Sequence, residues 1–132
     1  MKKPSVLALV AIVVLALAVA GCTPATTPTY VDLSVEEARE LIDSTSDLVI
    51  IDVSPKYDEG HIPGALHYYL ADGSLDKAIP TLDKSKTYLV YCHVDEVSIA
   101  GATALIDAGF ENVFRLEGNY GAWVDAGYPV EK

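Results

Sequence analysis

A single cysteine lies where a strand is expected to give way to a helix. The run Thr87–Tyr91 is largely apolar and rich in β-forming residues, which predicts a buried central strand, and Cys92 follows it directly. From Ser98 to about Ala108 the apolar residues recur at helical intervals, and Gly109 supplies a stop signal. A strand–loop–helix turn aims backbone N–H groups inward and favours an anion, such as a thiolate, at Cys92. The alternative is that Cys92 acts as a small buried hydrophobic residue.

The segment between this strand and this helix is the candidate substrate-binding loop. Its residues are His93, Val94, Asp95, Glu96, Val97 and Ser98. His93 is a candidate to supply a positive charge or a proton, or it is simply exposed. In the simplest interpretation, Ser98 caps the helix. The sequence has no Cys-x-x-Cys pair, no His cluster at metal-ligand spacing and no Gly-rich phosphate loop, so we expect neither a metal nor a cofactor.

The rest of the pattern predicts the elements that would position this loop. Ser34 followed by Glu37 has the spacing of a capping box and predicts a helix over Val35–Asp43. The continuous apolar run Leu48–Ile51 is typical of a strand that is covered on both faces. Shorter elements are expected at residues 67–69, 75–79, 112–116 and 120–126. This alternation predicts an α/β fold, a small and mainly parallel sheet flanked by helices on both faces.

The first 29 residues predict a leader and a tether. Lys2 and Lys3 precede the apolar run Val6–Ala20, and Val19-Ala20-Gly21-Cys22 has the form of a lipobox. We expect a lipoprotein signal peptide over 1–21, lipidation of Cys22, a Thr/Pro tether over 22–29 and a domain over 30–132. The chain would then be lipid-anchored to the cell membrane on its extracytoplasmic face. The alternative is an uncleaved anchor, but the 15 apolar residues fall short of the roughly 20 that span a bilayer.

The chain has a surplus of acidic residues. It carries 9 Lys and Arg residues against 19 Asp and Glu residues, a net charge of −10, and loss of the two leader lysines would make it −12. This charge argues against nucleic acid as a partner and against a basic face that docks on anionic lipid. With Cys22 as the lipid site, Cys92 has no partner within the domain, so no disulfide is expected. None of these features bears on the oligomeric state.

Three motifs in order give the chain a resemblance to single-domain rhodaneses, which are sulfurtransferases. They are Ile51-Asp52-Val53 leading to Gly60-His61-Ile62-Pro63-Gly64-Ala65, then Val90-Tyr91-Cys92 with its loop, and finally Leu116-Glu117-Gly118 with Ala122-Trp123. The resemblance covers roughly Tyr30–Lys132. It implies that Cys92 attacks a sulfane sulfur donor, becomes a persulfide and passes the sulfur to a thiol or protein acceptor. Within the front motif we expect Asp52 to order the following turn and His61 to bond backbone groups.

The loop departs from the pattern of rhodaneses that use thiosulfate. Those proteins usually place basic or small residues after the cysteine. This chain has Asp95 at a frequent glycine position and Val97 at a frequent arginine position, and Ser54 stands where the family commonly has arginine. The carboxylates of Asp95 and Glu96 would repel thiosulfate, so a neutral, cationic or protein-borne donor is expected.

Two other functions compete with enzymatic sulfur transfer. A non-catalytic rhodanese-fold binding or sulfur-carrier module would dock a partner through the acidic loop and keep Cys92 reactive toward it. Phosphatase chemistry on a related fold uses Cys-x5-Arg. Here the residue six positions after Cys92 is Ser98 and the loop holds no arginine, so we set this function aside.

Overall fold

The computed structural model describes Gly21, Thr27 and residues 29–132. The predicted leader up to residue 20, the lipidation site Cys22 and most of the tether lie outside the described residues. Within the described residues, no helix combines the length and the apolar character needed to cross a membrane.

Five parallel strands form one sheet, which confirms the α/β fold predicted from the sequence. In spatial order they are β1 (Val31–Leu33), β5 (Val113–Leu116), β4 (Tyr88–Tyr91), β2 (Val49–Asp52) and β3 (Leu66–His67). The central strand β4 is buried at all four positions, as its apolar run predicts. Asp52 pairs in register with Tyr91, so the carboxyl ends of β2 and β4 lie side by side.

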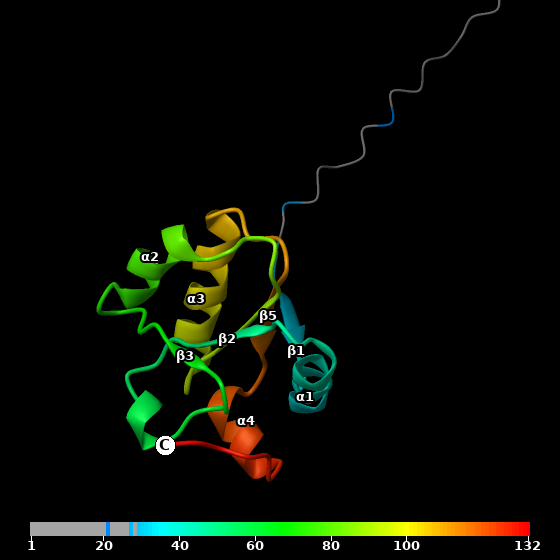
Figure 1. Cartoon of the computed structure of the whole chain (residues 1–132), viewed down its shortest axis with the longest axis vertical. Coiled ribbons are helices and arrows are strands. Elements are labelled where there is room, and N and C mark those ends of the chain that lie inside the picture. Colours follow the sequence, from blue (N-terminus) through cyan, green and yellow to red (C-terminus); the bar gives the residue numbers. More distant parts are fainter. Residues whose placement is uncertain (1–20, 22–26, 28) are drawn as a thin grey trace, which may run out of the picture.

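Helices cover both faces of the sheet. On one face lie α2 (Ser74–Ala78) and α3 (Asp95–Asp107), and on the other lie α1 (Val35–Ser44) and α4 (Asn119–Asp125) (Figure 1). Two short 3-10 helices, η1 (Tyr57–Glu59) and η2 (Ile79–Thr81), complete the connections. Successive residues at the end of β4 enter opposite cores, because side chains alternate along a strand. Val90 and Cys92 belong to one core cluster, and Leu89 and Tyr91 belong to the other.

α1 begins where the sequence predicts. The Ser34 hydroxyl accepts a hydrogen bond from the Glu37 N–H at 3.2 Å, and the Glu37 carboxylate accepts one from the Ser34 N–H at 2.8 Å. This reciprocal capping box satisfies two N–H groups at the start of the helix. The helix ends at Ser44, one residue beyond the predicted end.

The helix that follows Cys92 begins three residues earlier than predicted. α3 starts at Asp95, with Val94 as its N-cap and no capping side chain. Ser98 is therefore not the cap, and the prediction for it is wrong: it lies within α3, and its hydroxyl donates to the Asp95 carbonyl at 3.1 Å. The candidate loop is consequently split. His93 and Val94 connect Cys92 to α3, and the other four residues belong to the start of the helix.

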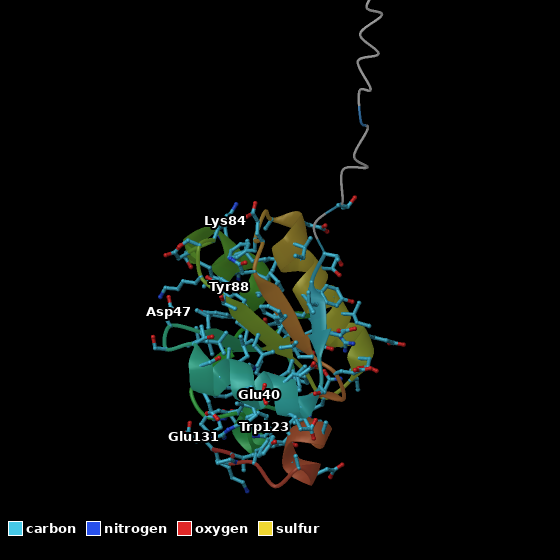
Figure 2. The ribbon with its side chains drawn as sticks, turned by 90° about the vertical axis from the view of Figure 1, so that its right-hand side faces the viewer. Glu40, Asp47, Lys84, Tyr88, Trp123 and Glu131 are labelled. Atoms are coloured by element: carbon cyan, nitrogen blue, oxygen red, sulfur yellow. The ribbon has the colours of Figure 1, made fainter. Side chains whose placement is uncertain are left out.

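Smaller elements near the ends of the sheet complete the fold. The edge strand β1 is absent from the sequence-based prediction, while β3 and α4 each begin one residue earlier than expected. Trp123 on α4 is 1% exposed, as expected for a core residue, and its indole N–H donates to the Pro129 carbonyl at 2.7 Å. Figure 2 shows Trp123, Glu40 of α1 and Glu131 of the C-terminal segment toward one end of the domain. Tyr88, at the start of β4, lies toward the opposite end of the domain.

Candidate active site

Cys92 lies at the carboxyl end of the central strand as a free, buried thiol that is 1% exposed. Both of its main-chain polar groups are held by the start of α4. The Cys92 N–H donates to the side-chain oxygen of Asn119 at 3.2 Å, and the Cys92 carbonyl accepts the N–H of Tyr120 at 3.0 Å. The backbone that carries the sulfur is therefore fixed by a helix 27 residues further along the chain.

The five backbone N–H groups that follow Cys92 in the chain have no partner within the described part of the chain. They belong to residues 93–97, which we call the amide cradle. The first N–H of this turn with a partner is that of Ser98, which donates to the Val94 carbonyl at 3.3 Å. Unpaired N–H groups at the start of a helix attract an anion, because they carry the positive end of the helix dipole. The turn thus offers several donors to an anionic sulfur at Cys92.

The Asp95 carboxylate is paired with a buried arginine. Its Oδ1 accepts from Arg115 at 2.9 Å and from the Asn119 side chain at 2.8 Å. Arg115 is 5% exposed and also donates to Asp32 at 2.6 Å. Burial lowers the pKa of Arg115, but its hydrogen bonds to Asp32 and Asp95 outweigh this effect and raise the pKa. The sequence predicts an Asp95 charge near Cys92 without a counterion. In the structure, the Arg115 guanidinium offsets that charge.

Sequence reasoning missed three members of this cluster, Asp32, Arg115 and Asn119. One signal was available for Arg115, because an arginine inside a short strand with apolar neighbours needs an acidic partner if it is buried. No signal identified which carboxylates would supply that partner. The Arg115 contacts reach Asp32 and Asp95, which lie 83 and 20 positions away in the chain.

His93 is partly buried against Tyr120. The two ring centroids are 4.7 Å apart, and the His93 Nε2 has no hydrogen-bond partner among the described residues. Desolvation lowers the pKa of His93 against the opposing charge of Asp52. At neutral pH the imidazole is therefore uncharged. It supplies no positive charge to the loop, although it keeps the capacity to accept a proton.

The front motif is structural, as expected for Asp52 and His61. The buried Asp52 carboxylate accepts the Ser54 N–H at 2.8 Å, which orders the turn after β2, while its Oδ2 has no partner among the described residues. The His61 Nδ1 lies 3.0 Å from the Tyr57 carbonyl oxygen. The His61 backbone also forms an antiparallel bridge with Glu131.

The remaining loop residues differ in environment. Val94 is 53% exposed, whereas Val97 packs against the core cluster that contains Cys92. Glu96 is exposed and forms no ion pair with the described residues. A shallow groove of about 400 Å³ does not include the loop and is lined by His67, Tyr68, Ser74, Lys77, Ala78 and Thr81.

Comparison of the sequence with known proteins finds one matching family and several relatives. The model of the rhodanese-like domain matches residues 34–126. The thiosulfate sulfurtransferase GlpE of Coxiella burnetii is 38% identical over 96 residues, which cover 71% of this chain and 87% of that protein. The protein of the same name from Pseudoalteromonas translucida is 29% identical over 93 residues, which cover 69% of this chain and 86% of that protein.

Solved structures agree with this match. The rhodanese-like domain of the Alr3790 protein from Anabaena sp. superimposes with a TM-score of 0.68 at 30% identity, covering 76% of this chain and 77% of that one. A thiosulfate sulfurtransferase from Pseudomonas aeruginosa gives a TM-score of 0.63 at 30% identity, covering 77% of this chain and 20% of that longer one.

Proposed function

The chain belongs to the rhodanese-like domain family, and on that premise we propose that it transfers sulfane sulfur as a persulfide on Cys92. The observation that carries this proposal is the amide cradle beside the thiol. Unpaired backbone N–H groups at the start of a helix can stabilise a thiolate and a persulfide anion without a metal or cofactor.

The proposed reaction has two sulfur-exchange steps. In the first, the Cys92 thiolate attacks the outer sulfur of a donor R–S–S⁻. A bond forms between the two sulfurs, the donor S–S bond breaks and R–S⁻ leaves. In the second, an acceptor thiolate attacks the outer sulfur of the Cys92 persulfide and releases the Cys92 thiolate. Each step exchanges one S–S bond for another, so no external oxidant or reductant is consumed.

The charges around the loop favour a donor other than thiosulfate. Arg115 is already bonded to Asp32 and Asp95, and Glu96 adds an exposed negative charge at the start of α3. The relatives from Coxiella and Pseudoalteromonas are named thiosulfate sulfurtransferases. For this chain we propose a cationic, neutral or protein-borne persulfide as the donor, because it avoids repulsion by Glu96.

The predicted lipid anchor gives the proposed activity a location. If Cys22 is lipidated, the Thr/Pro tether holds the domain at the extracytoplasmic face of the cell membrane. Labelling of cells with a fatty-acid analogue tests this directly. The wild-type chain should be labelled and Cys22→Ser should not, whereas equal labelling of both would contradict the anchor.

Turnover with two donors of different net charge, the thiosulfate dianion and the zwitterionic cysteamine persulfide, tests the function. The full chain, purified in mild detergent, is given thiosulfate or cysteamine persulfide together with a thiol acceptor. We expect faster turnover with cysteamine persulfide, whose ammonium group balances the charge of its persulfide, and none above background in Cys92→Ser. A persulfide that forms on Cys92 but passes to no small thiol would instead favour the sulfur-carrier module, which the acidic Glu96 and Asp95 would suit as a docking surface.

A further inference from the structure

We propose that Asn119 is a positioning residue for Cys92, and that Asp95 and Arg115 hold the Asn119 amide in the required orientation. This inference rests on the proposed sulfur transfer at Cys92. It assigns the residues that place the sulfur relative to the amide cradle, and it gives Asp95 a role different from the repulsion of donors.

The first argument is the direct contact between α4 and the cysteine backbone. The Asn119 side-chain oxygen accepts the Cys92 N–H at 3.2 Å, and the next residue, Tyr120, donates its N–H to the Cys92 carbonyl at 3.0 Å. These two hydrogen bonds engage both peptide groups that flank the Cys92 Cα. The direction of the Cys92 side chain is therefore set by the start of α4 as well as by β4.

The second argument is that the Asn119 amide can take only one orientation. Its nitrogen donates to Asp95 Oδ1 at 2.8 Å while its oxygen faces the Cys92 N–H. In the flipped orientation, the amide nitrogen would meet the Cys92 N–H donor and the amide oxygen would meet the Asp95 carboxylate. Because both contacts would be repulsive, Asp95 selects the orientation that binds Cys92. Asn119 is 3% exposed, so water does not easily replace these partners.

The third argument is that Asp95 is itself fixed. Arg115 donates to Asp95 at 2.9 Å, to the Ser98 hydroxyl at 3.2 Å and to Asp32 at 2.6 Å. The buried guanidinium thus joins β1 and β5 to the first turns of α3, the helix whose start forms part of the amide cradle. One network therefore holds the amide donors and the Cys92 backbone in a fixed relation.

The backbone of Asn119 makes this idea testable. Its φ is +57°, which makes it the one non-glycine residue with a positive φ among the described residues. Glycine adopts this conformation more readily than asparagine, so Asn119→Gly removes the side chain without straining the backbone. A loss of reactivity in this variant then reports on the two side-chain hydrogen bonds.

The experiment compares Asn119→Gly with Asn112→Ala in the full chain. Asn112 is an exposed control residue whose side chain makes no hydrogen bond with the described residues. We measure persulfide formation from cysteamine persulfide as a function of donor concentration, and alkylation of Cys92 by iodoacetamide, both resolved by peptide mass. For Asn119→Gly we expect the limiting rate to fall about tenfold, while the half-saturating donor concentration stays within about twofold of wild type. Loss of the buried hydrogen bonds should also lower the melting temperature by about 5 °C, so both rates are measured well below the melting temperature of the variant. Asn112→Ala should match wild type.

Two variants of Asp95 test whether its side-chain oxygen orients the Asn119 amide. Asp95→Asn keeps an oxygen that accepts from Arg115 and Asn119, so it should retain the limiting rate within about threefold. Asp95→Ala removes the acceptor and should lose about tenfold. If both variants lose the rate equally, the proposed orientation of Asn119 by Asp95 is wrong.

The two readouts separate this inference from the proposed function. If the wild-type chain takes up no sulfur although its Cys92 is alkylated, the proposed sulfur transfer is wrong. The positioning role of Asn119 is then tested by the alkylation rates alone. A tenfold slower alkylation of Asn119→Gly would support the positioning role. Limiting rates and alkylation rates of Asn119→Gly within twofold of wild type would overturn it. A loss that is seen only at temperatures where circular dichroism shows the variant to be partly unfolded would also overturn it.

Discussion

The side-chain oxygen of Asn119 accepts the backbone N–H of Cys92 at 3.2 Å, so the first residue of α4 holds the residue that directly follows the central strand. The same amide reaches Asp95 at the start of α3. Three elements that converge at one edge of the sheet are thereby joined around one thiol. The carboxyl edge of a parallel sheet is where α/β proteins commonly place their sites.

Removal of the exposed charge on Glu96 should improve the use of thiosulfate. Asp95 is paired with Arg115, whereas Glu96 has no ion pair among the described residues. We therefore expect Glu96→Gln to raise thiosulfate turnover by about two- to fivefold at low salt, because the repulsion of the thiosulfate dianion is weakened. The increase should shrink as salt screens the interaction. The measurement is thiosulfate turnover at two ionic strengths, with the exposed Glu36→Gln on α1 as the control for net charge. A rise of equal size in both variants would contradict a local effect.

Loss of Arg115 should destabilise the fold far more than loss of an exposed cation. The Arg115 guanidinium is buried and bonds Asp32, Asp95 and Ser98, so we expect Arg115→Met to lower the free energy of unfolding by about 3 kcal/mol. Lys56 and Glu59 form an exposed pair at 3.9 Å, and Lys56→Met should cost less than about 0.5 kcal/mol. Urea unfolding of both variants measures the difference. An equal decrease in the free energy of unfolding of both variants would contradict a stabilising role of the Arg115 network.

Acid should destabilise the protein partly through His93. Desolvation lowers the pKa of His93 in the folded state below its ordinary value of 6.5. The unfolded chain therefore binds more protons at this residue as the pH falls through 6.5, and the free energy of unfolding decreases. His93→Gln should reduce the loss of stability between pH 7 and pH 5.5, measured by urea unfolding at both values. An unchanged pH dependence in the variant would mean that His93 does not titrate differently on folding.

The sequence predicted the fold well because its main signals are local. The capping box at Ser34, the apolar runs of β2 and β4 and the stop after α3 each depend on residues a few positions apart. The start of α3 was missed because its N-cap is Val94, which carries no capping side chain, while Ser98 resembles a cap and lies inside the helix. The short edge strand β1 has no extended apolar run and was also missed.

The candidate site was predicted only in part. The position of Cys92 between a strand and a helix follows from local patterns, but the contacts of Arg115 and Asn119 depend on strand order and on where α4 begins. Asp95 illustrates the difference. From its residue type, Asp95 was predicted to carry an unpaired charge beside the thiol. In the folded chain Arg115 lies 2.9 Å from the Asp95 carboxylate, so Asp95 is part of a hydrogen-bonded network.

The most direct test of the central claim is the mass of the Cys92 peptide after exposure to a sulfur donor. The full chain is reduced, treated with cysteamine persulfide, thiosulfate or inorganic polysulfide, digested and compared with Cys92→Ser. We predict a gain of one sulfur on the peptide that contains Cys92, reversed by a reducing thiol, with cysteamine persulfide giving the greatest yield. No added sulfur with any donor, on a thiol that iodoacetamide still alkylates, would contradict the persulfide account.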